Sequence, residues 1–382
     1  MDAGVHGEVS AVGWCVVSRR MPLVAVLGEA WRNLASGTSR AALFAAVFVA
    51  TVGLVAFMDV RSVVSIVRGA AQFQAAGASV QVLTAAGNID GQRCGALAGV
   101  GQIGQAGAIR KGTPVTVLNM PGTPVNVVEA TPGVVAMLAS IGQPAQIGAG
   151  LAGGVWLSAD LAQMLGATPG AVIHTSAGAV TVAGVYTWPD DGRARDLGYV
   201  IVAPVPPDGV FDQCWAQVWP PDQNLADMTY MSLDNSGGGL AQVTFSQLNT
   251  TLGTTYDAAS LLANRLTARA PWAATLIGLI LGYAATRTRR LEIASALHAR
   301  VPKTGLACQH VLETLFWAVC AALIAAAALL WAARIGNPDP DPATWLIGIR
   351  IIAAATAATP IGTLAAIATT REQHLFRYSK DR

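Results

Sequence analysis

Charged residues are scarce in this sequence, and the short motifs of the common hydrolases are missing. Only 12% of the residues are charged, 53% are hydrophobic, and the formal net charge is +2. This composition argues against a soluble enzyme, and so small a net charge provides no basic surface for a nucleic acid. No G-x-x-x-x-G-K-[ST], HExxH, CxxC or G-x-S-x-G sequence occurs. We therefore expect no catalytic residue, no metal ligand and no cofactor site in this chain.

Long hydrophobic runs take the place of such motifs. Four segments have about the 20 apolar residues that a membrane-spanning helix needs, and they cover 41–60, 266–286, 312–333 and 345–369. Basic residues lie before the first run, between the second and third, and after the fourth: Arg19, Arg20, Arg32 and Arg40; Arg287, Arg289, Arg290, Arg300 and Lys303; Arg371, Arg377, Lys380 and Arg382. Because positive residues collect on the cytoplasmic side, we predict a multi-pass plasma-membrane protein with both termini cytoplasmic.

This pattern gives a complete division of the chain. An N-terminal tail (1–21) and an amphipathic cytoplasmic helix (22–40) precede the first span, and a cytoplasmic loop (287–311) joins the second span to the third. A short loop (334–344) and a large polar segment (61–265) lie outside, and a cytoplasmic tail (370–382) ends the chain. Met21 is an alternative start to Met1. A cleavable signal peptide is the alternative for the first span, but its apolar run exceeds the 7–15 residues of a signal core.

The helix predicted before the first span is amphipathic. Val24, Leu27, Trp31 and Leu34 recur at helical spacing, with polar residues on the other face. Such a helix is expected to lie in the cytoplasmic membrane interface. The alternative is a soluble helix that packs on a partner.

The large outer segment reads as an α+β domain carried on two helical stalks. Alternating or β-branched runs bounded by glycine and proline predict strands at 79–83, 113–118, 125–129 and 180–186. Helices are predicted at 131–141 and 158–165, where a threonine or serine begins each run. Residues 60–73 and 256–270 have helical spacing and are the predicted stalks. The fold class is therefore a membrane protein with four transmembrane α-helices and an α+β extracytoplasmic domain.

Two of the five cysteines fall in this outer domain. Cys94 and Cys214 would meet oxidising conditions there, so a disulfide between them is predicted. Two separate buried thiols are the alternative.

Among the ionisable residues, Arg350 lies inside an apolar run. It is a candidate contact for an anionic lipid or substrate, and the alternative is a side chain that extends to the outer interface.

Two segments resemble a known family. In 154–188, Leu165-Gly166 suits a helix end, Pro169-Gly170 a tight turn, and Val182-Ala183-Gly184-Val185 a strand. In the cytoplasmic loop, Arg290, Glu292 and Ile293 match an R-x-E-I pattern, followed by Leu312 and Glu313. Together with the topology, these residues are similar to the MacB-type ABC transporter permeases of the FtsX-like superfamily. The chain departs from that family at His298-Ala299-Arg300-Val301, where relatives have Ala-Leu-Gly-Ala.

The resemblance implies a permease subunit that carries no ATPase of its own. Its partners would be a second permease copy or homologue and two cytoplasmic ATPase subunits that bind ATP. ATP hydrolysis would move the outer domain through its stalks (mechanotransmission) and so export or extract an amphipathic peptide, antibiotic, lipid or lipoprotein. The loop residues expected to contact the ATPase are Arg289, Arg290, Glu292, Ile293, Leu297 and Glu313. Arg290 and Glu292 would give specificity, with Ile293 and Leu297 as apolar anchors.

Two alternatives remain open at this stage. The loop charges could serve only to cap the second span and to satisfy the inside-positive bias. The whole chain could also be a transmembrane signalling or regulatory protein, which senses a ligand or activates an envelope enzyme without transport.

Overall fold

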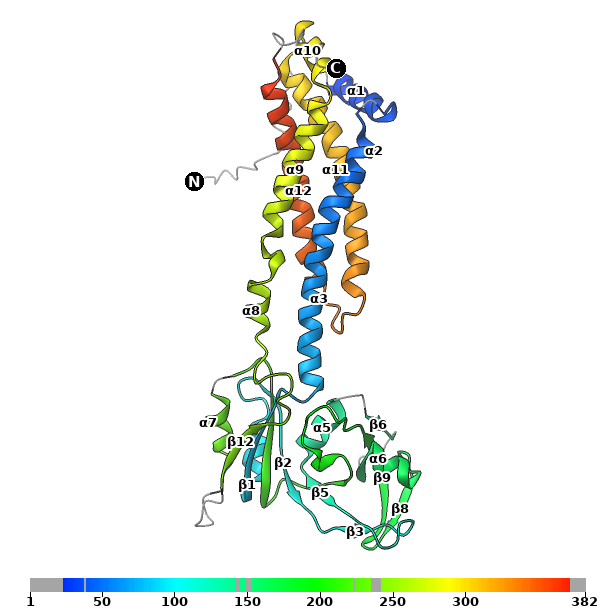
Figure 1. Cartoon of the computed structure of the whole chain (residues 1–382), viewed down its shortest axis with the longest axis vertical. Coiled ribbons are helices and arrows are strands. Elements are labelled where there is room, and N and C mark those ends of the chain that lie inside the picture. The colour runs from blue at the N-terminus through cyan, green and yellow to red at the C-terminus, as the bar shows by residue number, and fades with distance from the viewer. Residues whose placement is uncertain are drawn as a thin grey trace, which may run out of the picture. The chain divides into compact units, whose positions relative to one another are not determined.

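A computed structural model describes residues 23–37, 39–141, 145–148, 153–222, 224–234 and 242–371. The predicted tail at 1–21 and all but the first two residues of the predicted tail at 370–382 lie outside this range. The chain divides into two compact units (Figure 1). One, the helical unit, combines the chain up to Arg68 with Ala259 onward, and the other, the sheet unit, is Gly69–Ala258.

Long apolar helices make up the helical unit. Its elements are α1 (Leu23–Ala35), α2 (Ala41–Phe48), the π-helix η2 (Val49–Gly53), α3 (Leu54–Ala75), the 3-10 helix η5 (Leu266–Arg269), α9 (Ala270–Arg287), α10 (Arg290–His298), α11 (Lys303–Arg334) and α12 (Pro342–Thr369). In the described part of the chain, three helical runs are long and apolar enough to cross a membrane: Ala41–Ala75, Lys303–Arg334 and Pro342–Thr369. The predicted second span (266–286), most of which is α9, is not among them.

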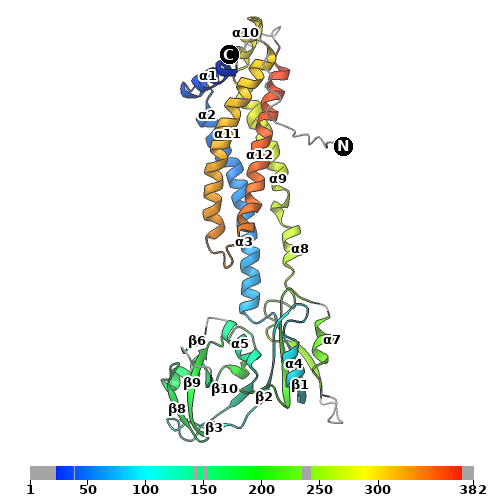
Figure 2. The ribbon, with the colours of Figure 1, turned by 180° about the vertical axis from the view of Figure 1, so that it is seen from behind.

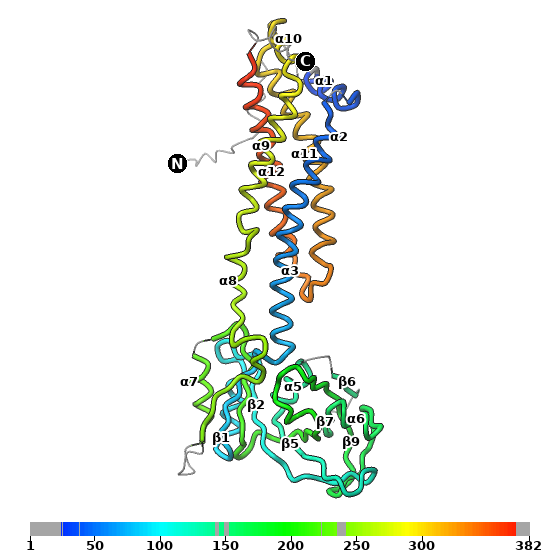
Figure 3. Tube along the Cα trace, viewed as in Figure 1, coloured from blue at the N-terminus to red at the C-terminus, as the bar shows by residue number. Residues whose placement is uncertain are grey.

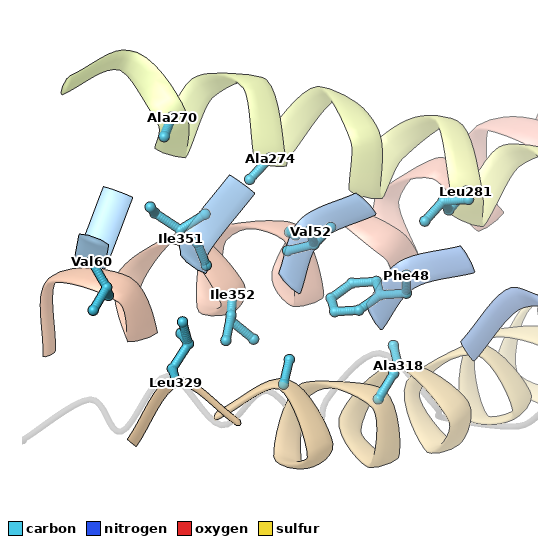
Figure 4. Close-up of a cluster of buried hydrophobic side chains, with 14 of the residues drawn as sticks. Phe48, Val52, Val60, Ala270, Ala274, Leu281, Ala318, Leu329, Ile351 and Ile352 are labelled. Carbon is cyan, nitrogen blue, oxygen red and sulfur yellow. The ribbon is translucent and has the colours of Figure 1, made fainter. Parts of the chain in front are cut away.

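The core of the helical unit is built largely from small and branched side chains. Phe48 and Val52 from the first run pack with Leu281 of α9, Ala318 of α11 and residues of α12 (Figure 4). Alanine recurs at this core because it lets helix axes approach closely, which is how helices gain contact in lipid. Close packing of small side chains therefore contributes more to this core than large hydrophobic residues do.

The closest helix contact in this core joins α9 to α12, which run side by side (Figures 1 and 2). A side chain at Gly278 would overlap the carbonyl of Ala355, and one at Gly282 the carbonyl of Thr359. The same row begins with Ala270 and Ala274, which lie two turns and one turn before Gly278. This stripe of small residues at every fourth position brings the two backbones into direct contact.

Gly282→Ala is expected to destabilise the helical unit. A methyl group there has to displace the α12 backbone, so we expect a loss of about 1–3 kcal/mol in the free energy of unfolding. Gly53→Ala is the matched control, because its new Cβ would stand 3.7 Å from the Cβ of Ala325, and alanine gains up to about 1 kcal/mol over glycine in a helix. Unfolding in detergent compares the two. Equal stability of the variants would contradict close packing at Gly282.

A mixed ten-stranded sheet forms most of the sheet unit, in the order β12-β1-β11-β2-β5-β10-β7-β9-β6, with β8 paired to β9. The strands are β1 (Val80–Asp90), β2 (Ile103–Lys111), β5 (Val127–Ala130), β6 (Gln146–Ile147), β7 (Val155–Ser158), β8 (Val172–Thr175), β9 (Gly178–Tyr186), β10 (Ile201–Pro204), β11 (Val210–Val218) and β12 (Thr244–Gln247). A separate pair joins β3 (Val115–Thr116) and β4 (Pro124–Val125). Its short helices are α4 (Gly91–Ala96), α5 (Pro132–Ser140), α6 (Ala159–Leu165), α7 (Leu225–Tyr230) and η3 (Arg195–Leu197). Helix α8 (Ala258–Ala263) begins at the last residue of this unit and continues into the helical unit.

Both faces of the first half of the sheet are buried. Val80 and Val82 of β1 point into one core with Trp215, while Leu83 and Ala85 point into another with Phe211. This alternation follows from the strand period of two. The predicted helices at 131–141 and 158–165 correspond to α5 and α6, with Thr131 and Ser158 as their N-caps.

Cys94 of α4 and Cys214 of β11 form a disulfide in the second of these cores, with 5.8 Å between their Cα atoms. Both residues are fully buried. We expect the parent protein to migrate faster on a non-reducing gel than on a reducing one, since the bond closes a loop of 120 residues. Cys94→Ser should remove this difference in mobility. Identical migration of the parent with and without reductant would contradict the bond.

The second stalk is not the continuous helix that the sequence predicted over 256–270. The structure has α8, a break at Asn264 and Arg265, and then η5 (Figure 3). Arg265 adopts an extended conformation (φ −61°, ψ 142°). Its side chain is bonded to Asp59 and to the carbonyl of Leu262, and these bonds stabilise the break.

Candidate functional site

Six polar residues gather at the end of the helical unit where α1, α10 and α11 meet. We call them the Glu313 cluster: Asn33, Arg289, Glu292, Gln309, His310 and Glu313. Asn33 Nδ2 of α1 donates to Glu313 Oε1 over 2.8 Å, and Gln309 Nε2 donates to the same oxygen over 3.2 Å. Arg289 donates to the other carboxylate oxygen. One carboxylate on α11 thus ties together three separate parts of the chain.

Arg289 is the cation of this cluster and is only 7% exposed. Its Nη2 and Nε atoms bind the two oxygens of Glu292 at 2.6 and 2.8 Å, an arrangement that adds geometric specificity. Burial lowers the pKa of Arg289, but the hydrogen bond of Glu292 and the charge of Glu313 outweigh it, so that this pKa is raised overall. His310 Nδ1 lies 3.6 Å from Glu313 and 3.4 Å from Arg289.

The structure buries two of the residues that the sequence predicted as contacts for an ATPase, Ile293 and Leu297. Their side chains are 1% and 8% exposed, in a small core with Leu306 of α11 and Ile367 of α12. They anchor α10 to its own bundle. Arg289 and Glu313 are likewise buried in the Glu313 cluster, and their contact with a partner stays a prediction.

The accessible face of α10 is polar. Glu292 keeps 49% of its side chain exposed, and Ser295, His298 and Arg300 are also exposed. Arg290 is partly exposed. Arg300 has a φ of 62°, a conformation that favours glycine, and it stands where the resembled family has glycine.

The exposed face of α1 is apolar. Val24, Leu27 and Trp31 are 81%, 54% and 63% exposed, whereas Val26 and Ala30 are buried. The ring of Trp31 meets that of Phe316 edge-on, with 6.1 Å between centroids. Three of the four apolar residues that the sequence singled out are therefore exposed, and the fourth, Leu34, is half-buried.

A second polar group joins the two stalks at the other end of the helical unit. Arg265 Nε donates to Asp59 Oδ1 over 2.8 Å, and both residues are nearly buried, with side-chain exposures of 12% and 0%. The hydroxyls of Ser62 and Thr267 lie 3.3 Å apart. Asp59 Oδ2 is also buried, and none of the residues that the structure describes forms a hydrogen bond with it. This ion pair links α3 to the segment that leads into α9.

Helix α3 is also bonded to the turn between α11 and α12. Arg61 donates to the carbonyl of Ile335 over 2.7 Å, and Arg68 donates twice to the carbonyl of Gly336, over 2.7 and 3.1 Å. Arg350, by contrast, is exposed on α12 and is bonded within its own helix to the carbonyl of Ile347.

In the sheet unit, the last turn of α3 is held by side chains from two loops. Arg193 donates to the carbonyl of Ala75 over 3.1 Å, and Asn249 donates to the carbonyl of Ala76 over 3.0 Å. Arg193 is paired with Asp191 at 2.7 Å, and Asn249 also bonds Asp191. The end of the stalk is therefore fixed to the residues that follow β9 and β12.

Sequence reasoning missed Asn33, Gln309, His310 and the Asp59–Arg265 pair. Asn33 and Glu313 are 280 positions apart, and Asp59 and Arg265 are 206 apart. One signal was available for Asp59: a carboxylate at the end of an apolar run is costly unless it is paired. No comparable local pattern marks Asn33.

Comparisons with solved structures give likenesses to parts of transport proteins. The periplasmic region of MacB from Actinobacillus actinomycetemcomitans shares 10% identity over 46% of this chain and 91% of its own length, with a TM-score of 0.34. A domain of a putative permease protein from Porphyromonas gingivalis shares 15% identity over 47% of this chain and 95% of its own length, with a TM-score of 0.31. The extracellular domain of a noncanonic ABC-type transporter, YknZ, from Gram-positive bacteria shares 14% identity over 44% and 100%, with a TM-score of 0.31.

At TM-scores of 0.31 to 0.34, these likenesses do not establish a common fold or function. No protein-family model and no curated protein matches the sequence.

Proposed function

We propose that the chain is the permease subunit of a MacB/FtsX-like ABC transporter. The observation that carries this proposal is the Glu313 cluster, which fixes α10 and α1 to α11 and leaves a polar face of α10 exposed. A short helix held this firmly by buried charges is suited to transmit force from a bound partner. The sequence resemblance around Arg290 and Glu292 supports a cytoplasmic ATPase as that partner.

In this proposal α9 also crosses the membrane, in addition to the three membrane-capable helical runs. Its 18 residues are preceded directly by η5 and pack along α12 through the row from Ala270 to Gly282. Small residues in such a row are typical of helix pairs in membranes. With four spans, both termini would lie on the same side of the membrane as α10, and the basic residues there favour the cytoplasmic side.

Movement would pass from α10 through the bundle to the two stalks. ATP hydrolysis by a pair of ATPase subunits would shift α10 and α11 together, since Ile293 and Leu297 pack against α11 and α12. The Asp59–Arg265 pair would then move both stalks as one. The sheet unit would act on an amphipathic substrate in a dimer with a second permease, while this chain itself performs no catalysis.

The test is ATP hydrolysis that copurifies with the chain from its native membranes. Ser295→Arg adds bulk to the exposed face of α10 and leaves the Arg289–Glu292 contact in place. We expect it to remove most of the copurifying activity. Ser65→Arg, at an exposed position on α3, is the matched control and should retain it.

Glu292→Lys provides a second variant on the same face. A chain that yields no nucleotide hydrolysis, or hydrolysis unaffected by both α10 variants, would contradict the permease proposal. The signalling alternative predicts the first of these results.

A further inference from the structure

The sheet unit contains a cavity of about 650 Å³. Its floor is the face of β1, β11, β2 and β5 that carries Val82, Trp215, Ile109 and Val128. The loop after β9 adds a wall with Trp188 and Leu197. Volumes of about 300–1,000 Å³ with mainly apolar walls are typical of small-molecule sites.

The wall of this cavity is fixed before any ligand arrives. Tyr186 Oη donates to the carbonyl of Leu197 over 2.8 Å, and Trp188 Nε1 donates to the carbonyl of Ala194 over 2.8 Å. Burial raises the pKa of the Tyr186 phenol, so that it stays a donor. The indoles of Trp188 and Trp215 lie 6.4 Å apart between centroids. A preformed wall lowers the entropy that binding costs.

The charged groups at the cavity fall into two classes. Arg110 is committed to Glu129 at 2.6 Å, and Asp212 accepts from the backbone amides of Gly87 and Lys111 at 3.0 Å each. The side chains of Lys111 and Asp196 form no ion pair with any residue that the structure describes. One ammonium and one carboxylate therefore remain for a ligand.

We propose that this cavity binds a short apolar peptide in its zwitterionic form. Lys111 binds the peptide carboxylate, Asp196 binds the terminal ammonium, and the floor accepts the apolar side chains. Thr84, Gln213 and Ser246 also line the cavity and supply hydrogen bonds for the peptide groups. A purely anionic or cationic amphipath would leave Asp196 or Lys111 facing a like charge.

Binding in the cavity would affect the end of the α3 stalk. The loop that carries Trp188 and Leu197 also carries Arg193, which holds the carbonyl of Ala75 at the end of α3. A ligand bound against Trp188 and Leu197 would therefore stabilise the loop that makes this contact. The binding itself requires neither nucleotide nor an ATPase, so it can be tested apart from the proposed permease function.

Trileucine is the probe, titrated into the full chain in lipid nanodiscs by calorimetry. We expect one peptide to bind each chain, with affinity reduced about threefold by Lys111→Met and about threefold by Asp196→Asn. Ser246→Trp fills the cavity from an exposed position on β12 and should abolish binding. Gln146→Trp, at an exposed position on β6, is the matched control and should bind as the parent does.

Two peptides with one charge removed test the zwitterion itself. N-acetyl-trileucine and trileucine amide should each bind more weakly than trileucine. Equal binding of either one would overturn the assignment of Asp196 or Lys111, respectively. Absence of trileucine binding, or full binding to a Ser246→Trp protein whose near-ultraviolet circular dichroism is unchanged, would overturn the site.

Discussion

Replacing Glu313 by alanine is expected to lower the free energy of unfolding of the helical unit by about 3–5 kcal/mol, the range for breaking a buried ion pair. The carboxylate is 3% exposed and accepts from Asn33, Gln309 and Arg289. Its removal leaves those three donors without their acceptor in a place that water does not reach. Unfolding in detergent, followed by tryptophan fluorescence, measures the loss.

Glu29→Ala is the control for this prediction. Glu29 pairs with Arg32 on the same α1 helix that carries Asn33, but the side chains are 44% and 76% exposed. An exposed pair contributes about 0–1 kcal/mol, so this variant should resemble the parent. If both variants lose the same small amount of stability, the Glu313 cluster does not hold α1 and α10 in place.

Loss of one partner of the Asp59–Arg265 pair should be equally severe. Arg265→Leu leaves the fully buried Asp59 carboxylate without its cation, and breaking such a pair costs about 3–5 kcal/mol. The double variant Asp59→Leu with Arg265→Leu should recover most of this loss, because apolar side chains can replace a buried pair at little cost. A double-mutant cycle on the unfolding free energy tests both statements.

The same cycle separates stability from movement. If the ion pair makes the two stalks move together, the double variant should be stable and yet lose ATP-dependent function. Arg195→Leu, which breaks the exposed pair with Asp190, should change neither quantity. Single and double variants of equal stability would show that the pair contributes nothing to the junction.

Much of the fold could be predicted from local patterns in the sequence. The apolar runs at 41–60, 312–333 and 345–369 lie within the three membrane-capable helical runs, and the strand runs at 79–83 and 180–186 fall in β1 and β9. These features repeat with a period of a few residues, so neighbouring side chains suffice to define them. The two outer cysteines could be paired because only two were present in that segment.

The geometry of the candidate site could not be predicted from the sequence, because its contacts join residues that lie far apart along the chain. Ile293 and Leu297 have the spacing of an apolar stripe, and such a stripe fits a partner or the chain's own bundle equally well. In the structure the stripe packs on the chain's own bundle, against Leu306 and Ile367, and Ile367 lies on a helix far along the chain. The break at Arg265 has one local signal, because Pro271 disfavours a helix that continues through this point. The bond that stabilises it comes from Asp59, which lies 206 positions away.

The bonds from Arg61 and Arg68 end on the main chain of the turn between α11 and α12. Carbonyl oxygens are supplied by every residue type, so these bonds do not depend on the side chain of Ile335. Gly336 is constrained for another reason, because its φ of 61° favours glycine and a side chain there would also meet the guanidinium of Arg68. The number of residues in the turn is a different matter, since one more or one fewer would move both carbonyls out of reach. Related chains should therefore differ here by substitution and agree in length.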